Sequence, residues 1–484
     1  MRDADRHSRR DLLRLAGAGA LTGVAATGAP LALPARAAAT ARTITLVRTG
    51  RFEPVGAPDW HYVPVDVPQG ASAIAVSYSV ASQGSPPGNV LDIGIFDSSG
   101  HDLGNAAGFR GYSGGARSRF TITASHATPG YLAGPVEPGR WHVLLGPYTV
   151  APEGMDWRVE VTLTLGDRPG PDFVAAPAQT AVPGTGPGWY RADLHLHSVH
   201  SDGLRTLPEL AAAAQRAGLD LIASTEHNTS SAGLVWGHHA PPDLLVLNGE
   251  EVTTRTGHWL ALGTPAGTFV DWRYRAAEGH LGRFADQVRG LGGLVVAAHP
   301  FAPFKGTRWE FGYDDVDAVE VWNGPWTLDD QAAVEQWHGR LVAGRRTPVV
   351  GSSDSHREDQ PVGTAQTVVR LERLERAEVV RALGAGRSYL AESLRVAVGF
   401  TVSDGVDTVG CGETLHTDPT GVVQANLEVH GAPGCIAQVL GPAGPIAAGK
   451  VDPTGRATVS GTAPAATTPF LRVEVRRPAP TDTT

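Results

Sequence analysis

The chain has 484 residues, of which 42% are hydrophobic and 18% charged, so it can bury substantial cores and widespread disorder is not expected. Two cysteines exclude a disulfide-rich scaffold and a cysteine-based metal cluster, and a formal charge of −9 argues against a protein that coats nucleic acid. The length predicts several domains. Eleven of the 18 histidines lie between residues 189 and 356, which indicates metal or proton chemistry in that part of the chain.

The first 37 residues have the pattern of a targeting segment. A twin arginine, Arg9 and Arg10, precedes a mild apolar run rich in Ala and Gly, and Ala35-Arg36-Ala37 places small residues where a signal peptidase cleaves. This pattern resembles a Tat export signal, which implies the Tat translocase as a partner during export. An ordinary amphipathic helix is the alternative, and the glycines of the run disfavour it.

Export would place the protein outside the cytoplasm, as an extracellular, cell-wall-associated or periplasmic protein. The segment carries six basic and three acidic residues, so its cleavage would change the formal charge from −9 to about −12. We find no other apolar run of transmembrane length in the sequence, and no membrane span is expected.

The remaining chain divides into regions with different hydrophobic patterns. Residues 43–166 alternate apolar and polar side chains and are punctuated by Gly and Pro, which predicts an N-terminal β-sandwich. Residues 167–188 are rich in Gly and Pro and are expected to be a linker. Residues 189–395 alternate short apolar strands with helical stretches, which favours a mostly parallel sheet or barrel. Residues 396–478 return to a β pattern and are expected to form a smaller β-sandwich.

Within residues 189–395 the elements can be placed more closely. Strands are expected at 190–197, 219–224, 244–247, 258–262, 294–298, 318–321 and 348–351. Helices are expected at about 207–217, 281–291, 329–343 and 375–385. The first helix has a capping-box signature, Thr206 followed by Glu209.

Most of these predicted strands end in a His, Asp or Glu. The C-terminal ends of parallel strands meet on one face of a barrel, so we expect these side chains to lie together. A period of two puts His195 and His197 on the same face of the first strand. Imidazole and carboxylate ligands without thiolate suit Zn, Mn or Fe(II). The motifs are Asp193-Leu194-His195-Leu196-His197 with Ser201-Asp202-Gly203, Glu226-His227-Asn228, Gly249-Glu250-Glu251-Val252-Thr253-Thr254 with His258, His299-Pro300 and Asp354-Ser355-His356.

These motifs, in this order, resemble those of the PHP (polymerase and histidinol phosphatase) superfamily of metal-dependent phosphoesterases, and most of all its CehA/McbA-type metallohydrolases. The resemblance covers about residues 190–395. It implies a multidomain chain with a central distorted (β/α)7 barrel, flanked here by the two sandwiches, and a centre of two or three divalent metal ions. It implies one metal held by His195, His197, Glu251 and Asp354, a second by Glu251, His258 and His299, and a third by Asp202, His227 and His356.

Some positions leave alternatives open. Glu226 stands where the superfamily more often has Asp, and we expect it beside the ligand His227 rather than on the metal. Glu250 competes with Glu251, and His280 competes with His258. Four histidines lack a motif and are expected to be ordinary surface residues: His200, His238, His239 and His338.

The resemblance implies an exported metal-dependent hydrolase, first of all a phosphoesterase in which a metal-bridging hydroxide attacks a small phosphate ester. Asp202 or His356 would assist the leaving group. The same hydroxide could attack the carbonyl of a carboxylic or carbamate ester, which is the second hypothesis. A non-catalytic protein that binds surface glycans is the third.

Substrate contacts are expected beside the metal motifs. The candidates for binding an anionic group are Asn228, Lys305, Arg308 and Arg357. Aromatic residues that hint at an organic moiety are Phe301, Phe304, Trp309, Trp322 and Trp326. Cys411 and Cys435 could form a disulfide in an exported protein, and they have no expected catalytic role.

Overall fold

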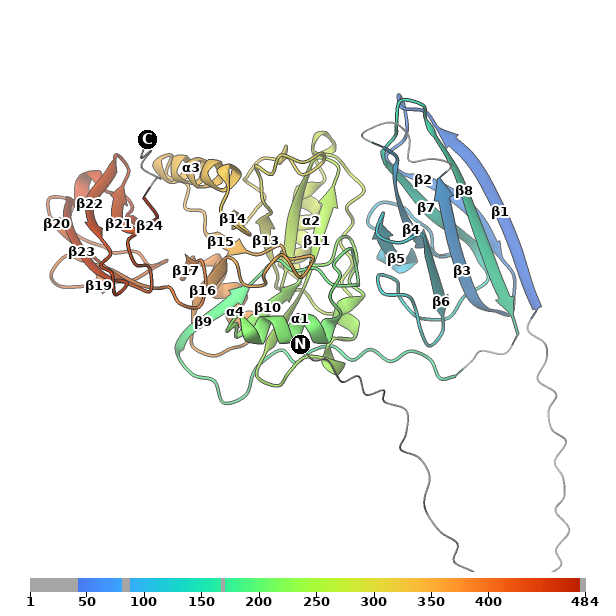
Figure 1. The fold of residues 1–484 in the computed structure, drawn as a ribbon, viewed down its shortest axis with the longest axis horizontal. Coiled ribbons are helices and arrows are strands. Elements are labelled where there is room, and N and C mark those ends of the chain that lie inside the picture. Colours follow the sequence, from blue (N-terminus) through green and yellow to red (C-terminus); the bar gives the residue numbers. More distant parts are fainter. Residues whose placement is uncertain (1–41, 81–87, 167–169, 479–484) are drawn as a thin grey trace, which may run out of the picture. The chain divides into compact units, whose positions relative to one another are not determined.

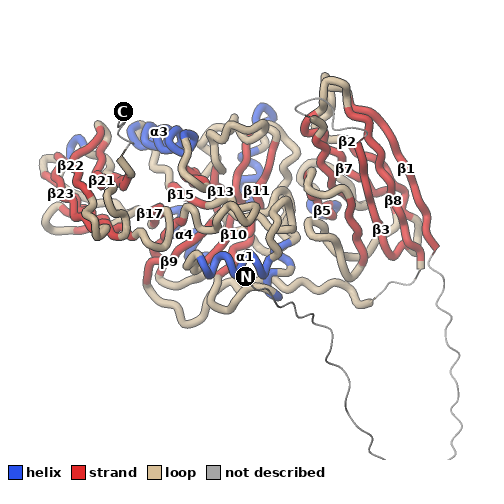
Figure 2. The backbone as a smooth tube through the Cα atoms, viewed as in Figure 1, coloured by secondary structure: helices blue, strands red, loops and turns tan. Residues whose placement is uncertain are grey.

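The computed structural model describes residues 42–80, 88–166 and 170–478 (Figure 1). The Tat segment expected at residues 1–37 lies outside these residues. The described chain is built mainly from strands, with few helices (Figure 2). The sheet-rich, multidomain organisation expected from the sequence is confirmed. Within the described ranges, no helix is both long enough and apolar enough to cross a membrane.

The first region is a pair of four-stranded antiparallel sheets. Its strands are β1 (Arg42–Phe52), β2 (His61–Val67), β3 (Ala71–Val80), β4 (Val90–Phe96), β5 (Phe109–Gly114), β6 (Arg119–Thr123), β7 (Gly139–Thr149) and β8 (Met155–Leu165). The sheets have the orders β1-β8-β3-β6 and β2-β7-β4-β5. Alternate residues of β8 are buried, and inward-facing side chains of both sheets, such as Ile74 and Trp141, share one core.

The central region is a nine-stranded sheet that carries the predicted metal motifs. Its strands are β9 (Gly188–Asp193), β10 (Leu221–Ser224), β11 (Leu245–Thr254), β12 (Gly257–Leu262), β13 (Leu294–Ala297), β14 (Ala318–Asn323), β15 (Val349–Ser352), β16 (Gln366–Leu371) and β17 (Ser388–Ala391). The order is β15-β14-β13-β12-β11-β10-β9-β16-β17. A parallel bridge between Leu196 and Ser355 links the segments after β9 and β15, so the sheet curls back on itself. The four-residue strands β10 and β13 are buried throughout, as expected for strands covered on both faces.

The helices lie where the sequence predicts them. They are α1 (Leu207–Arg216), α2 (Leu281–Gly290), α3 (Leu328–Val342) and α4 (Arg376–Gly384). The capping box before α1 is present, with the backbone N–H of Thr206 donating to Glu209 at 2.8 Å.

A regular sevenfold alternation of strand and helix is not seen in this region. β11 pairs antiparallel with β12 because only two residues join them, too few for the crossover that parallel strands need. β13 leads to β14 through residues 298–317 without an α-helix, and β16 runs antiparallel to β9. The short connections leave the strand ends and their loops close to one another.

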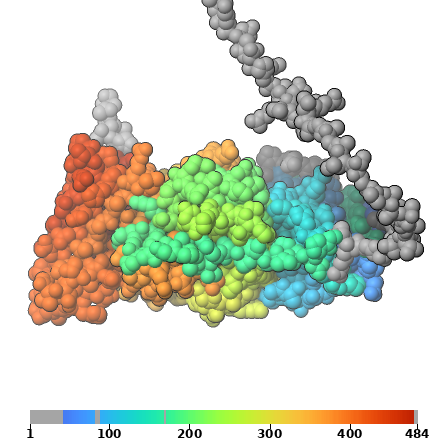
Figure 3. Space-filling view, turned by 90° about the horizontal axis from the view of Figure 1, so that it is seen from below, coloured from blue at the N-terminus to red at the C-terminus, as the bar shows by residue number. Residues whose placement is uncertain are grey.

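The segment expected to be a linker lies against the central region. Residues 170–187 contain no regular element and run along the surface (Figure 3). The backbone N–H of Ala176 donates to Leu234 at 2.8 Å, and that of Val182 donates to Leu374 at 2.9 Å. The described residues group into one compact unit, and the domain boundaries drawn from the sequence stay predictions.

The last region contains two further antiparallel sheets. Its strands are β18 (Ala397–Ser403), β19 (Thr408–Val409), β20 (Val422–His430), β21 (Ile436–Gly441), β22 (Gly444–Lys450), β23 (Arg456–Pro464) and β24 (Arg472–Arg476). The sheet orders are β19-β18-β20-β23 and β22-β21-β24, around a core that includes Leu427 and Val439. Cys411 and Cys435 are free thiols, so the disulfide considered from the sequence is not formed in this structure.

Candidate metal centre

The nine residues predicted as metal ligands form one continuous cluster at the strand ends of the central sheet. β9, β10, β13 and β15 each end just before one or more of them, and β11 and β12 contribute from within the strand. Glu251 lies at the middle of the cluster. Its carboxylate oxygens approach imidazole nitrogens of five histidines at 2.8–3.3 Å: His195, His197, His227, His258 and His299.

Four of these residues surround a buried point, and we call them the closed half: His195, His197, Glu251 and Asp354. His195 Nε2 lies 3.2 Å from Glu251 Oε2 and 3.4 Å from Asp354 Oδ1. His197 Nε2 lies 3.3 and 3.1 Å from the same two oxygens. Each of these four atoms is buried and without a hydrogen-bond partner.

This arrangement fits a divalent cation. Four unpartnered polar atoms in one buried place would be strongly unfavourable, since buried polar groups normally have partners. A tetrahedral ion with ligand distances of about 2.0–2.2 Å separates neighbouring ligand atoms by about 3.3–3.6 Å. The distances in the closed half, 3.1–3.4 Å, are close to that spacing. Two imidazoles and two carboxylates are also the donor set that Zn, Mn and Fe(II) accept.

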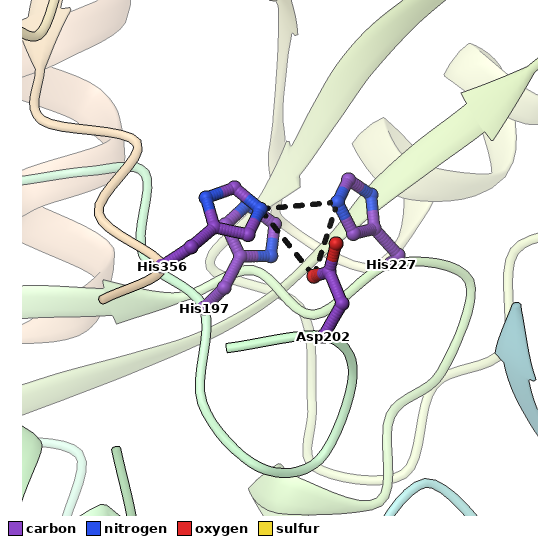
Figure 4. Close-up of side chains that lie close together, drawn as sticks. All are labelled: His197, Asp202, His227 and His356. Carbon is purple, nitrogen blue, oxygen red and sulfur yellow. Dashed lines mark hydrogen bonds and ion pairs between the residues drawn. The ribbon is translucent and has the colours of Figure 1, made fainter. Parts of the chain in front are cut away.

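Three further residues, which we call the open half, are Asp202, His227 and His356. Figure 4 shows their side chains converging from three separate segments, with His197 beside them. Asp202 Oδ1 lies 3.5 Å from His227 Nε2 and 3.3 Å from His356 Nε2, and the two Nε2 atoms are 3.5 Å apart. These three separations fit ligand atoms that would hold one metal ion, and His197 belongs to the same group of possible ligands.

The two halves differ in exposure. The side chains of His195, His197 and Glu251 are at most 1% exposed, whereas that of Asp202 is 45% exposed. The side chains of His227, His356 and Asp354 are 21–23% exposed. A substrate can therefore reach the centre from the side of the open half.

His258 and His299 lie next to Glu251 on its far side. His258 Nδ1 is 2.8 Å and His299 Nε2 is 3.0 Å from Glu251 Oε1. His299 groups with Glu251 and His195 as possible ligands of one ion, but His258 is not in that group. Glu250, the alternative to Glu251, points elsewhere and accepts a hydrogen bond from the backbone of Val270 at 3.1 Å.

Backbone strain is concentrated at this centre. Among the residues that the structure describes, those other than glycine with positive φ are Asn228 (53°), His299 (26°) and Asp354 (48°). His299 and Asp354 are predicted ligands that follow strand ends, and Asn228 directly follows the predicted ligand His227. Such conformations persist only where the surroundings hold them, and they are typical of functional sites.

Glycine is required in the segment that carries Asp202. A Cβ atom on Gly203 would lie 2.4–2.6 Å from the backbone of His197 and Ser198, closer than any real contact. The absence of a side chain therefore allows the Asp202 segment to pack directly on the chain that carries the closed half.

Glu226 supports the same segment, as the sequence suggested. Its carboxylate accepts hydrogen bonds from Ser198 Oγ at 2.5 Å and Ser201 Oγ at 2.6 Å, and from the backbone N–H of Ser198 at 3.1 Å. Glu226 is buried, and these hydrogen bonds go to serines that are not among the nine predicted ligands. Its longer side chain spans from β10 to the loop after His197.

Two supporting residues on β14 were not predicted from the sequence. Glu320 lies 3.3 Å from His195 Nδ1 and accepts a hydrogen bond from the backbone N–H of His299 at 2.9 Å. Asn323 donates to Glu320 at 3.1 Å and to Asp354 Oδ2 at 3.3 Å. A carboxylate on the second nitrogen of a ligand imidazole fixes its tautomer and orientation. The available signal was a single Glu in the otherwise apolar run 318–321.

The charges of the cluster are strongly coupled. Burial alone would raise the pKa of Glu251, but His227, His195 and His258 hold it well below its usual value. Burial opposes protonation of His227, yet Glu251 and Asp202 raise its pKa to about 10. Burial lowers the pKa of His258 to about 4. Without a cation, protonated imidazoles therefore balance the buried carboxylates, and a divalent ion would replace those protons.

The four residues proposed for substrate binding have different surroundings. The side chain of Asn228 is buried, and its Oδ1 accepts from the backbone N–H of Thr253 at 2.7 Å, so it ties its loop to β11. Lys305 Nζ donates to the carbonyl of Tyr148 at 2.6 Å, away from the cluster. Arg357 is exposed and pairs with Asp359 at 3.1 Å, and Arg308 is exposed. None of these contacts reaches the nine clustered residues.

Comparison with known proteins identifies similar structures. No protein-family model and no curated protein matches the sequence. A two-domain protein from Bacteroides vulgatus, containing a predicted PHP-like metal-dependent phosphoesterase, is 16% identical over 62% of this chain and 98% of its own, with a TM-score of 0.36. A candidate metal-dependent phosphoesterase from Bifidobacterium adolescentis is 20% identical over 40% of this chain and 94% of its own (TM-score 0.28). An amidohydrolase from Chromobacterium violaceum, with bound sulfate and no metal, is 19% identical over 36% and 89% (TM-score 0.26).

One of these neighbours is described as PHP-like, another as a metal-dependent phosphoesterase and the third as an amidohydrolase. Their identities and TM-scores are low, so the case for a metal centre rests on the converging side chains described above.

Proposed function

We propose that this chain is an exported, PHP-type metal-dependent hydrolase that cleaves phosphate esters, with the closed and open halves as its metal centre. The observation that carries the proposal is the closed half. Four buried atoms without hydrogen-bond partners, from His195, His197, Glu251 and Asp354, surround one point at the spacing of a metal's ligands. The open half adds three more ligand atoms at the same spacing on the solvent side.

Divalent ions bound in these places would lower the pKa of water to make a nucleophile and withdraw charge from the phosphoryl oxygens. The chain's own residues orient this chemistry. Glu320 holds the His195 ring, and the carbonyl of Asp354 accepts from His356 Nδ1 at 2.8 Å, so that Nε2 of each ring is turned into the cluster. A substrate would reach the centre at the partly exposed side chains of the open half.

Asp202 is the better placed of the two residues proposed for proton transfer. Both are on the exposed side, but His356 Nδ1 is engaged by the carbonyl of Asp354 and its Nε2 faces Asp202. Only one oxygen of Asp202 faces the imidazoles, at 3.3 and 3.5 Å, and the side chain is 45% exposed. That exposure would let Asp202 reach the leaving group of a substrate and accept a hydrogen bond there.

An activity panel on metal-loaded protein tests the proposal. Purified protein reconstituted with Zn2+ or Mn2+ is assayed with p-nitrophenyl phosphate, bis-p-nitrophenyl phosphate, naphthyl acetate and a naphthyl carbamate. Turnover of a phosphate ester that falls with a chelator and returns with metal supports the proposal. The matched variants are His197→Ala and His238→Ala, since His238 is exposed and outside the cluster.

The alternatives predict other results on the same panel. Turnover of the acetate or carbamate without the phosphates would establish a carboxylic or carbamate ester hydrolase with the same centre. Tight metal binding with no turnover of any substrate, together with binding on a glycan array, would establish a binding protein. Failure of the wild-type protein to bind any divalent ion would contradict the whole proposal.

Export by the Tat pathway is tested separately. Residues 1–37 fused to a reporter that is active only after folding in the cytoplasm and export should deliver it outside the membrane. Changing the pair Arg9 and Arg10 to Lys should stop that delivery. Unchanged delivery in a Tat-deficient host would contradict this part of the proposal.

A further inference from the structure

Two of the three open-half ligands, Asp202 and His356, lie on loops that an arginine side chain connects. Asp202 belongs to residues 198–205, between β9 and α1, and His356 belongs to residues 353–365, between β15 and β16. These two ligands have loop backbone on each side. Their mutual distance of 3.3 Å therefore depends on what holds one loop to the other.

Arg205 provides that connection. Its guanidinium is buried and donates to Ser355 Oγ at 2.8 Å, to the carbonyl of Arg357 at 2.6 Å and to the carbonyl of Gln360 at 3.1 Å. Ser355 and Arg357 are the residues on either side of His356. Every one of these acceptors therefore belongs to the segment that carries His356.

One backbone hydrogen bond also joins these two loops, and a second closes the loop that carries Asp202. The N–H of Leu204 donates to the carbonyl of His356 at 2.7 Å, and the N–H of Val199 donates to the carbonyl of Arg205 at 2.9 Å. Gln360 closes the other side, because its Oε1 accepts from the backbone N–H of His356 at 2.8 Å. Asp202 is three residues from Arg205, in the loop that these bonds hold against the His356 segment.

The chemistry of the contacts requires an arginine. A guanidinium presents several N–H donors in one rigid plane, so it can hold three acceptors on one loop at fixed positions. A lysine has one flexible ammonium and cannot reproduce that geometry. The acceptors are two neutral carbonyls and one hydroxyl. The contacts therefore position the loop, and none of them is made with a carboxylate that is a predicted metal ligand.

We propose that Arg205 is the positioning residue of the open half, which sets the separation of Asp202 and His356 and so allows a divalent cation to bind there. This inference rests on the proposed function and deepens it. It assigns to a residue outside the metal motifs the task of keeping the solvent-side cation in place, while the closed half has its own support from Glu320 and Asn323 on β14.

Cation binding by Arg205 variants tests this inference without relying on activity. Full-length wild type, Arg205→Lys, Arg205→Ala and Arg216→Ala are titrated with Co2+, and bound metal per chain and the visible absorption of Co2+ are measured. Arg216 is the matched control, since it is exposed on α1 and lines the same surface hollow of about 420 Å3 as Arg205. Losing a partner that orients a ligand weakens metal affinity about 10- to 100-fold.

We expect both Arg205 variants to lose the weaker, solvent-side Co2+ by that factor and to keep the buried one, with Arg216→Ala equal to wild type. Added guanidinium ion should restore the lost absorption in Arg205→Ala, because the hollow beside Arg205 opens to solvent. Where substrate turns over, KM should rise more than kcat falls if the solvent-side cation binds substrate.

Two results would overturn the inference. One is wild-type Co2+ binding at both places in Arg205→Ala and Arg205→Lys. The other is loss of both cations together with a lowered thermal midpoint in both variants, which would make Arg205 a residue of general stability. Either result leaves the proposed function standing if the wild type binds metal and turns over phosphate ester, and a wild type that binds no cation contradicts the function itself.

Discussion

The closed and open halves of the candidate metal centre use the same kinds of side chain but are held in different ways. The closed half is at the ends of buried strands, and its ligands are supported by Glu320 and Asn323 from the neighbouring strand β14. The open half lies on loops that are joined through Arg205, and its side chains are partly exposed. This difference predicts a tightly held cation inside and a more exchangeable one at the surface.

The largest effect is expected from the closed half. His197→Ala removes a buried ligand and leaves Glu251 and Asp354 facing one another without it. We expect metal affinity and turnover to fall more than about 100-fold, beyond the range of a supporting residue. Bound metal by atomic spectroscopy and phosphate ester turnover are the measurements. Full activity in His197→Ala, or equal loss in His238→Ala, would show that the closed half is not the metal site.

A substitution in the open half should remove the solvent-side cation and leave the buried one. Asp202→Asn keeps the size of the side chain and removes the charge that faces His227 and His356. We expect loss of the solvent-side cation with retention of the buried one, and about a 100-fold fall in kcat, the lower end of the range for general acid–base catalysis. Asp286→Asn, an exposed change on α2, is the control. Loss of both cations in Asp202→Asn would mean that the halves do not bind independently.

Acid is expected to release metal from the centre, because the pKa of His227 is raised. In the metal-free protein this pKa is raised to about 10, so a proton must leave His227 for a metal to bind at any lower pH. Each proton released lowers apparent affinity about tenfold per pH unit of acidification, about 100-fold between pH 8 and pH 6. Co2+ titrations at these two pH values measure this slope. Affinity that is independent of pH would contradict the placement of His227 as a ligand.

The same pKa predicts how metal changes stability. A raised histidine pKa stabilises the metal-free protein fully below the ordinary value of 6.5, and that contribution is lost as the pH rises toward 10. The lowered pKa values of Asp202 and Asp354 act oppositely, since their contribution is present above 3.8 and lost as the pH falls. The gap in thermal midpoint between metal-loaded and metal-free protein should therefore widen from pH 6.5 to pH 9. A constant gap would contradict this charge balance.

The smallest effect is expected from the support of the closed half. Glu320→Gln keeps the shape of the side chain and weakens its interaction with His195 Nδ1, 3.3 Å away. We expect about a 10-fold fall in metal affinity with both cations still bound. Glu428→Gln, an exposed change on β20, is the control. An effect as large as that of His197→Ala would place Glu320 on the metal rather than behind a ligand.

Much of the centre could be predicted because its residues lie at strand ends in short motifs. Asp193 to His197, Glu226-His227 and Asp354-Ser355-His356 each follow an apolar run, and buried strands bring such ends together. Glu320 and Arg205 were missed for a different reason. A single carboxylate in a strand and an arginine in a loop acquire their roles only through partners 125 and 150 residues away in the sequence.

The residues proposed for substrate binding show where sequence proximity misleads. Asn228 and Lys305 lie next to ligand motifs, but a neighbour in a loop can point either way. Asn228 bonds to the backbone of Thr253, and Lys305 bonds to Tyr148 on β7. Both residues are close to ligand motifs in the sequence, but the polar atoms of their side chains bond to residues outside the nine clustered ones.

The sequence by itself determined the sheet-rich organisation, the positions of the four helices in the central region and the kinds of side chain that meet at its strand ends. Hydrophobic periodicity and capping residues are local signals, and they act within a few residues of chain. Only the tertiary structure decided that Glu251 lies between five histidines, that β12 turns back on β11, and that Arg205 holds the two loops of the open half. These are contacts between distant segments, whose geometry depends on how the whole sheet curls and packs.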